Sequence, residues 1–162
     1  MLYNEAHSHV GFLLSEVIQH RDLNMKTKHY LTLADAEFLL EQAYQYALSQ
    51  NFNVSIAVTD ETGTLLAMKR MDGASPMTAN LCLEKAKCSA ISRRPSKLFE
   101  DIIKGGQMGF LTMDTFSGML EGGEPIMYEG QLVGAMGVSG VKSFQDAEIA
   151  QVAIEKFLAQ LG

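Results

Sequence analysis

The stretch Val54-Ser-Ile-Ala-Val-Thr-Asp-Glu-Thr-Gly63, which continues as Thr64-Leu-Leu-Ala-Met-Lys-Arg70, decides the fold of this chain. Large apolar residues alternate with small or polar residues over 53–59, a pattern typical of a strand with one buried face. Residues 60–63 have turn chemistry, and the glycine at the last of these positions can adopt a positive φ. Residues 64–70 are therefore expected to return beside the first strand, so the stretch predicts an antiparallel β-hairpin.

A helix is predicted on the N-terminal side of this hairpin. Thr32 is a favourable N-cap residue, and Asp35 three positions later completes a pattern similar to a capping box. Apolar residues then recur at helical spacing until about residue 50. The positions predicted to be buried are Ala36, Leu39, Leu40, Ala43 and Ala47.

A second helix is predicted on the C-terminal side of the hairpin. Ser75 followed by Pro76 matches an N-cap with proline at the first helical position, and Pro95 stops the helix after about residue 92. Its predicted apolar stripe consists of Ala79, Leu83, Ala86 and Ala90. A short helix over 96–103 is expected to follow.

Glycine dominates the next part of the chain. Residues 115–120 are predicted to form a third strand, and 126–128 with 131–138 a second hairpin. Gly134 and Gly137 make the last strand slim, which indicates the close approach of another backbone or a ligand. Ser143 with Asp146 predicts the N-cap of a final helix. The expected buried face of that helix is Ile149, Val152, Ala153, Phe157 and Leu161.

The order of these elements predicts an α/β protein of the α+β type, in which helices pack on an antiparallel sheet. All four histidines fall within the first 29 residues. We therefore expect residues 1–29 to be an N-terminal extension, helical or flexible, and residues 30–162 to be the domain. Residues 1–24 are either a native extension or the product of an upstream start, with Met25 as the alternative first residue.

The composition excludes several classes of partner. A net charge of −6 and a pI of about 5.2 do not suit a nucleic-acid-binding surface. No apolar run is long enough for a membrane span, and the first residues lack the basic start of a signal peptide. Cys82 and Cys88 lie six positions apart in one predicted helix, roughly 9 Å, too far for a disulfide. Reduced thiols suit the cytoplasm, which is the expected location.

Few residues suggest catalysis. Since no histidine follows His29, a serine or cysteine nucleophile would have to recruit its base from the N-terminal segment. Lys85 lies beside the apolar stripe of its helix, where it would either bind an anionic ligand or, as is commoner, remain solvated. Asp72 and Asp146 are candidate acids, although a capping role is favoured for Asp146. Methionines gather around the glycine-rich loops, which favours an adaptable apolar pocket.

These motifs, taken in order, resemble one family. Besides the opening stretch, Leu83-Glu-Lys-Ala86, Gly122-Gly-Glu-Pro-Ile126 and Val133-Gly-Ala-Met-Gly-Val-Ser-Gly140 are similar to the GlcG/HbpS family, which includes the C-terminal domain of PduO proteins. Order and spacing are kept over about residues 31–160, and the ordered set is far more specific than any single motif. The resemblance implies a profilin-like sandwich around a five-stranded antiparallel sheet. It also implies homodimers or higher assemblies, octamers among them.

The resemblance further implies haem as the cofactor, because some members bind or degrade it. Their iron-ligating histidine lies immediately before the first helix, where this chain has Tyr30, with His29 one residue earlier. Tyrosinate can ligate haem iron, so Tyr30 and His29 are the expected metal ligands. The alternative is that Tyr30 only anchors the helix start in a protein without haem. The rest of the family's pocket corresponds by position to Asp72, Gly73, Ala74, Lys85, Gly122 and Gly123.

Three hypotheses about function follow. The first is a binding or accessory protein for a small ligand, haem or another tetrapyrrole, that associates with copies of itself. The second is an enzyme of glycolate-type or diol-type metabolism acting on a small organic acid or aldehyde. In it Lys85 would bind the carboxylate, the Gly122 and Gly123 amides would polarise a carbonyl, and Asp72 or Asp146 would move the proton. The third is an assembly subunit without a ligand.

Overall fold

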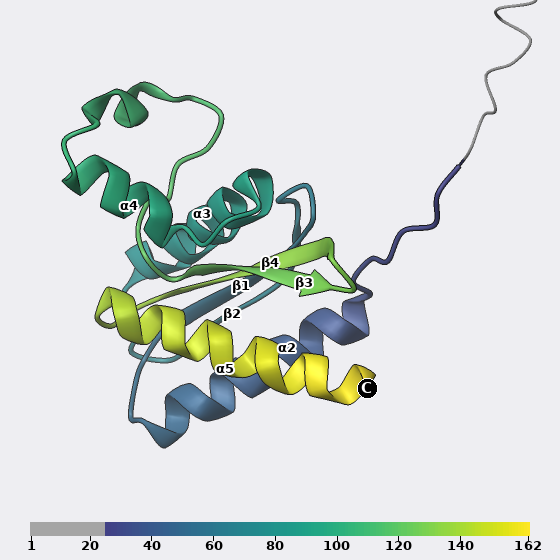
Figure 1. Cartoon of the computed structure of the whole chain (residues 1–162). Helices are drawn as coiled ribbons and strands as arrows, with labels where there is room; N and C mark the ends of the chain where they lie inside the picture. Colours follow the sequence, from purple (N-terminus) through teal and green to yellow (C-terminus); the bar gives the residue numbers. More distant parts are fainter. Residues whose placement is uncertain (1–24) are drawn as a thin grey trace, which may run out of the picture.

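The computed structural model of the chain describes residues 25–162 (Figure 1). The extension predicted over 1–24 lies outside this described part. Four strands form one sheet: β1 (Ser55–Asp60), β2 (Leu65–Arg70), β3 (Gly123–Tyr128) and β4 (Gln131–Ser139). Their order is β2-β1-β4-β3, and every neighbouring pair is antiparallel. Both predicted hairpins are therefore present, and they join through β1 and β4.

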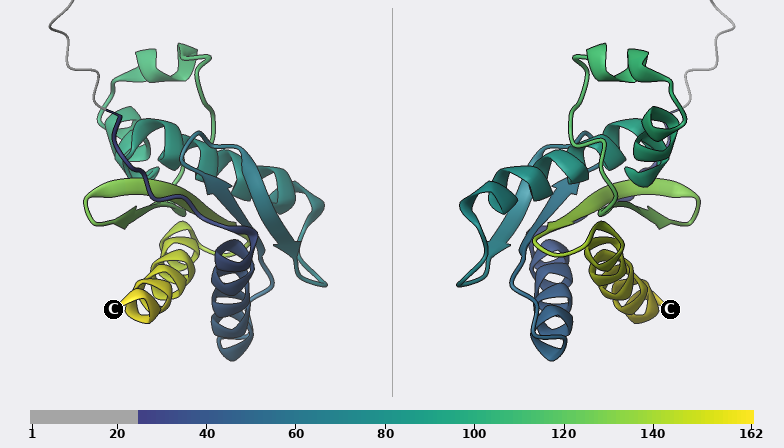
Figure 2. Two further views of the ribbon diagram at one scale, coloured as in Figure 1. Left: turned by 90° about the vertical axis from the view of Figure 1, so that its right-hand side faces the viewer. Right: turned by 90° about the vertical axis from the view of Figure 1, so that its left-hand side faces the viewer.

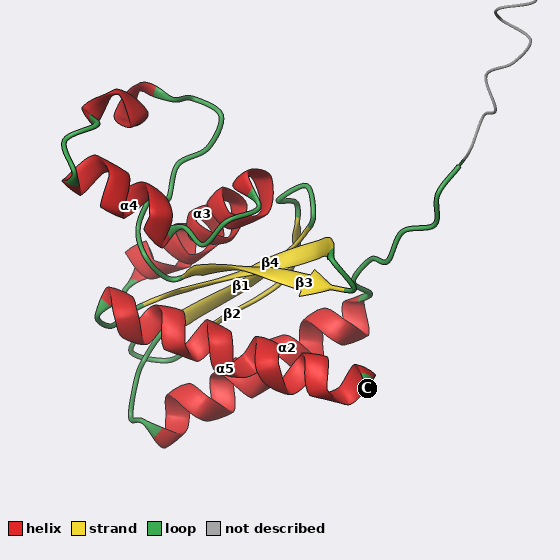
Figure 3. Ribbon diagram, in the orientation of Figure 1, coloured by secondary structure: helices red, strands yellow, loops and turns green. Residues whose placement is uncertain are grey.

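Helices cover both faces of this sheet. The helices α2 (Leu33–Ser49) and α5 (Ser143–Leu161) lie side by side on one face, and α3 (Pro76–Ser92) lies on the other (Figures 1 and 2). Beyond α3, the short α4 (Lys97–Lys104) and the 3-10 helix η1 (Met108–Thr112) project away from the sheet (Figure 3). The predicted α+β class, with an antiparallel sheet flanked by helices, is confirmed.

The five-stranded sheet was wrong for the described residues, since the sheet there has four strands. The segment 115–120 was the expected third strand, and it forms no strand between η1 and β3. Gly118 and Gly122 adopt positive φ angles of 70° and 121°, which interrupt an extended run. The Leu120 carbonyl accepts instead from Ser96, the N-cap residue of α4, and the Ser117 hydroxyl donates to Glu84 of α3.

The start of α2 forms as predicted. The Asp35 carboxylate accepts hydrogen bonds from the Thr32 amide at 2.8 Å and from its hydroxyl at 2.7 Å, and the Asp35 amide donates to the Thr32 hydroxyl at 3.3 Å. All five apolar positions predicted for this helix are buried. Leu31, just before the cap, is buried as well, so the chain enters α2 in a fixed position.

The two faces of the sheet differ in the size of their side chains. Val54, Ile56 and Val58 join the main hydrophobic core with residues of α2 and α5. The opposite face of β1 carries Ser55, Ala57 and Thr59, which are completely buried although small. The Ser55 and Thr78 hydroxyls are hydrogen-bonded at 2.7 Å, so this second face packs against α3.

Gly137 allows α3 to approach β4 closely. A Cβ at this position would lie 2.0 Å from the Cys82 carbonyl oxygen and 2.6 Å from the Ala86 nitrogen. The backbone of α3 is therefore in direct contact with the backbone of β4, as the slim last strand predicts. On the other face, a Cβ at Gly134 would lie 2.5 Å from the Leu31 side chain.

Three details of the helices differ from the predictions. The N-cap of α5 is Lys142, and Ser143 is the first helical residue, so Asp146 is not the third. On the predicted buried face of α5, Ile149, Ala153 and Phe157 are buried, but Val152 is only half-buried and Leu161 is exposed. The buried side of α3 is also rotated relative to the predicted stripe. Ala86 and Ala90 are buried as expected, but Ala79 and Leu83 are only half-buried. The full buried set is Thr78, Cys82, Lys85, Ala86, Cys88, Ser89 and Ala90.

None of the helices within residues 25–162 combines the length and apolar character needed to cross a membrane.

The close packing of α3 on β4 yields the first prediction. Gly137→Ala should lower the free energy of unfolding by about 3 kcal/mol or more, because its Cβ meets backbone atoms that cannot rotate away. Gly109→Ala is the matched control, since a Cβ there meets nothing within 4 Å. Urea unfolding of both variants measures the difference. Equal stabilities for the two variants would contradict the close contact.

Candidate functional site

Residues 117–123, which we call the strap, link the η1 region to β3 across α3 and α4. The Ser96 hydroxyl donates to the Leu120 carbonyl at 2.5 Å and accepts from the Gly123 amide at 2.8 Å. The Glu121 amide donates to Glu100 at 2.6 Å. Two side chains at the start of α4 therefore hold the last half of the strap.

The first half of the strap rests on α3. A Cβ at Gly118 would lie 2.3 Å from the Glu84 carbonyl carbon and 2.5 Å from the Lys85 nitrogen. The Ser117 hydroxyl donates to the Glu84 carboxylate at 2.5 Å. This bond lowers the pKa of Glu84, aided by Lys87, although partial burial opposes it. The strap is thus attached along its whole length.

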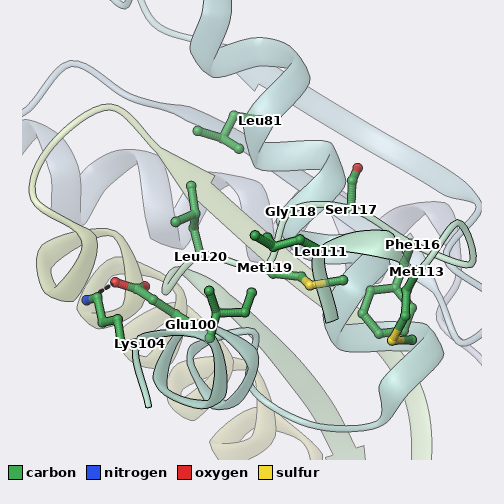
Figure 4. A pocket seen from close by; sticks show the side chains of 11 residues that line it. Leu81, Glu100, Lys104, Leu111, Met113, Phe116, Ser117, Gly118, Met119 and Leu120 are labelled. Carbon is green, nitrogen blue, oxygen red and sulfur yellow. Dashed lines mark hydrogen bonds and ion pairs between the residues drawn. The ribbon is translucent and has the colours of Figure 1, made fainter. Parts of the chain in front are cut away.

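An apolar pocket of about 410 Å³ opens between the strap, α4 and the segment around η1 (Figure 4). Hydrocarbon and thioether groups form nearly all of its wall. The lining residues are Leu81, Glu100, Ile103, Lys104, Leu111, Met113, Phe116, Ser117, Gly118, Met119 and Leu120. Met113 and Met119 belong to the methionine-rich region that predicted an adaptable pocket.

Glu100 and Lys104 form an ion pair at the edge of this pocket (Figure 4). Burial by itself would raise the pKa of Glu100, but the bonds from Lys104 and the Glu121 amide outweigh burial and lower that pKa. Glu100 is therefore a carboxylate at neutral pH. Its two oxygens are occupied, one by Lys104 and the other by the strap.

A second ion pair lies completely inside the protein. The Lys85 ammonium donates to Asp146 at 2.8 Å and to the Val138 carbonyl at 3.0 Å, and the two side chains are only 2% and 3% exposed. The other Asp146 oxygen accepts from the Val141 amide at 3.2 Å. Burial raises the pKa of Asp146, while Lys85 and the amide oppose that rise.

The solvated position favoured for Lys85 was wrong, since Lys85 joins α3 to the start of α5. Asp146 stabilises the structure as expected, but through Lys85 and the Val141 amide rather than as the predicted cap. Gly122 and Gly123 enclose the pair. A Cβ at Gly122 would lie 2.9 Å from the Lys85 Nζ, and one at Gly123 would lie 2.2 Å from the Lys85 carbonyl oxygen. The structure thus brings together four of the candidate residues, at a place that leaves no room for a substrate. These residues are Lys85, Asp146, Gly122 and Gly123.

Asp72 and Gly73 lie elsewhere, in the exposed turn between β2 and α3. Gly73, at φ 84°, packs against the Asn53 side chain. Among the described residues, no hydrogen bond or ion pair joins this turn to Lys85 or Asp146. The enzyme hypothesis named Asp72 or Asp146 as the proton carrier beside Lys85. The structure places Asp72 away from Lys85, whereas Asp146 is paired with the Lys85 ammonium itself.

His29 and Tyr30 lie at a third place, beside the N-terminal end of α2. The His29 Nε2 is 3.0 Å from the Glu129 carboxylate, and its ring meets the Tyr128 ring edge-on at 5.0 Å between centroids. Tyr30 is 71% exposed. A hollow of about 120 Å³ separates these residues from α5. Its lining residues are His29, Tyr30, Leu31, Asp35, Tyr128, Val133, Phe157 and Leu161.

The two cysteines do not suit catalysis or metal binding. Both are free and completely buried in α3, and burial raises the pKa of each thiol to about 12. Within residues 25–162, no group of three or more His, Cys, Asp or Glu side chains could hold a metal ion. A side chain that binds a metal already held by a macrocycle, such as haem iron, needs no such group around it.

Glu124 is a further buried acid, on the face of β3 that meets α5. Its Oε1 accepts from Gln151 at 3.2 Å, and the residue is 8% exposed. Burial raises its pKa to about 7; the Gln151 bond opposes this rise and nearby Glu121 adds to it. The carboxyl therefore titrates near neutral pH inside the folded protein.

Comparison with known proteins finds a family model that matches this chain and a protein with a similar sequence. The family model described as "Haem degrading protein HbpS-like" matches residues 31–155. Protein GlcG of Escherichia coli K12 is 40% identical over 115 residues, which cover 71% of this chain and 85% of GlcG.

Solved structures agree with this result. The crystal structure of Klebsiella pneumoniae protein ORFY matches with a TM-score of 0.78 and 28% identity, covering 85% of this chain and 97% of ORFY. The crystal structure of the PduOC:haem complex matches with a TM-score of 0.70 and 25% identity, covering 78% and 94% of the two chains.

The buried ion pair yields a prediction that a double-mutant cycle can test. Lys85→Met and Asp146→Leu should each lower the free energy of unfolding by about 3 kcal/mol, because each leaves one buried charge without its partner. The double variant should lose at least about 1 kcal/mol less than the sum of the two. The same cycle on the exposed Lys97–Asp101 pair should show a coupling of no more than about 0.5 kcal/mol. Additive losses at Lys85 and Asp146 would contradict the pairing.

Glu124 yields a prediction about pH. Its folded-state pKa of about 7 exceeds its ordinary value of 4.5, so protonation favours the folded protein. The contribution is complete below about pH 4.5 and is lost as the pH rises through 7. Between pH 5 and 8, the wild type should lose about 1–2 kcal/mol of stability relative to Glu124→Gln, after allowance for solvent screening. The exposed Glu155→Gln is the control, and parallel pH profiles for wild type and Glu124→Gln would refute the prediction.

Proposed function

The chain belongs to the HbpS-like family, and on that premise we propose that it binds haem or another tetrapyrrole. The family match and the 40% identity to GlcG establish the membership. The descriptions of the matching family and of one matching structure support the choice of ligand. The family description names haem degradation, and one matched structure is a haem complex.

The exposed pair His29–Tyr30 is the observation on which this proposal depends. An imidazole and a phenol are both ligands that haem proteins use for iron. Here they are adjacent, at a position held by the buried Leu31 and by the Thr32–Asp35 cap of α2. Tyr30 projects from the surface with 71% of its area exposed, so its oxygen is accessible to a large planar molecule.

The residues around this pair include apolar side chains that a macrocycle could contact, but the hollow between them is too small to enclose one. Tyr128, Val133 and Leu161 offer an apolar floor. The hollow itself measures about 120 Å³, whereas pockets that enclose a drug-sized ligand usually measure roughly 300–1,000 Å³. Haem would therefore lie across the hollow, with Tyr30 or His29 at the iron and most of the ring outside. The iron, when bound, supplies redox and Lewis-acid chemistry.

This incomplete enclosure supports self-association as part of the proposal. A ring that one protomer leaves uncovered keeps a large apolar face in water, and a second copy of the chain that covers it would remove that cost. We therefore propose a homodimer or a higher assembly as the form that binds the ligand. The existence of pockets large enough for organic molecules disfavours an assembly subunit without any ligand.

A hemin titration tests the proposal. Full-length wild-type protein should develop a Soret band on addition of hemin, and His29→Ala/Tyr30→Ala should lose it, because both candidate iron ligands are gone. The single variants Tyr30→Phe and His29→Ala show which side chain contributes. Tyr44→Phe, a tyrosine substitution within α2 and away from the pair, should leave the spectrum unchanged.

Histidines outside the described residues provide the second control. A His7→Ala/His9→Ala/His20→Ala variant should retain the Soret band if Tyr30 or His29 is the ligand. A band that disappears only in this triple variant would move the site away from the α2 start. If hemin mixed with the wild-type protein gave the same spectrum as free hemin, haem binding would be refuted altogether.

A further inference from the structure

We propose that the apolar pocket between α4, the strap and η1 is a second binding site, separate from the His29–Tyr30 surface, for an uncharged and largely hydrocarbon small molecule. The two sites share no lining residue. They also lie apart in the molecule, since the α4 and η1 region projects beyond α3 while the segment before α2 lies near the β3–β4 turn (Figure 1).

The size of the pocket suits a small organic molecule. At about 410 Å³, it falls within the usual range of roughly 300–1,000 Å³ for ligand pockets. Figure 4 shows Leu120, Met119 and Leu111 pointing into one shared space, with Phe116 and Met113 along its side. A hydrocarbon or aromatic body would contact side chains from three different segments of the chain.

The wall of the pocket is already organised in the free protein. The strap is held by Ser96, Glu100 and Glu84. Phe116 meets Phe99 of α4 edge-on at 5.1 Å between ring centroids, which fixes the aromatic part of the wall. A ligand therefore does not have to order this region, and the cost of ordering would otherwise weaken its binding. The thioethers of Met113 and Met119 remain adaptable in shape.

The charges at the edge of the pocket decide the class of ligand. Glu100 has one oxygen on Lys104 and the other on the Glu121 amide. A cationic ligand would have to compete with Lys104, and an anionic ligand would meet Glu100 beside the same lysine. A charged group that leaves water without an unpaired counter-ion pays a large desolvation cost. The pocket therefore selects against both charges and accepts an uncharged molecule.

A matched pair of fluorescent probes tests this selection on the full-length protein. N-phenylnaphthylamine is uncharged, and anilinonaphthalene sulfonate is the same ring system with an added sulfonate. Fluorescence titration should give a Kd for the uncharged probe at least about tenfold lower than for the sulfonate, because only the latter desolvates a charge. Equal affinities, or a preference for the sulfonate, would overturn the assignment.

Two variants of η1 locate the probe. Leu111 and Met108 are 58% and 57% exposed in the same short helix, but only Leu111 lines the pocket. Leu111→Asn should weaken binding of the uncharged probe about fivefold or more, and Met108→Asn should change it less than twofold. Neither change buries a polar group, so both variants are expected to fold; circular dichroism verifies this.

Other results would refute the second site. Equal losses in the two variants would mean that the probe binds general apolar surface of η1. A wild-type protein that binds neither probe at any concentration used, while sedimentation shows an assembly, would mean that a second copy of the chain covers the pocket. Hemin bound at Tyr30 should leave the affinity of the uncharged probe unchanged. Competition between hemin and the probe would mean that both bind at one site.

Discussion

The burial of the Lys85 ammonium against Asp146 is the interaction on which the arrangement of this protein depends. A charge that is 2% exposed is tolerated only with a partner and further hydrogen bonds, and here Asp146, the Val138 carbonyl and the Val141 amide provide them. The pair connects the middle of α3, the end of β4 and the first turn of α5. Gly122 closes it from the strap side because no side chain would fit there. One ion pair thereby ties both layers of helices to the sheet.

This constraint separates the molecule into a rigid part and a part suited to binding. On the α2 and α5 side, large apolar residues such as Ile56 and Val58 fill a conventional core. On the α3 side, Gly137 and Gly118 let backbones touch, so little volume remains for side chains or ligands. Among the described residues, the apolar pocket lies beyond α3, where α4 and η1 project, and the hollow beside His29 lies at the start of α2, where Tyr30 is exposed. The two proposed sites occupy these two regions.

Local interactions made part of the fold predictable from the sequence. The cap at Thr32 and Asp35 and the buried face of α2 depend on neighbours within one or two turns, and both were predicted correctly. The slim strand at Gly137 was also interpreted correctly, since a glycine inside a strand often marks a close approach of backbone. The buried face of α3 was not predictable in this way. Its apolar residues are small and evenly spread, so the sheet on one side and the strap on the other decide which side chains are buried.

The candidate sites required contacts that a single sequence does not reveal. Lys85 and Asp146 were each singled out, but nothing in a sequence that separates them by 61 positions indicates that they meet. The methionines around the glycine-rich loops gave the one usable signal for the apolar pocket, whereas the roles of Glu100 and Ser96 depend on hydrogen bonds to the strap. Residues 115–120 resembled a strand in composition, but the positive φ of Gly118 and the bonds of Ser117 and Leu120 to side chains outside the sheet give them another conformation.

The most direct test of this account is a side-chain NMR measurement of the lysine ammonium groups. Exposed lysines exchange their ammonium protons rapidly with water, whereas an ammonium buried against Asp146 and the Val138 carbonyl is shielded from exchange. The account predicts one slowly exchanging ammonium signal at neutral pH that disappears in Lys85→Met and persists in Lys97→Met. Rapid exchange of every lysine ammonium in the folded protein would contradict the buried pair.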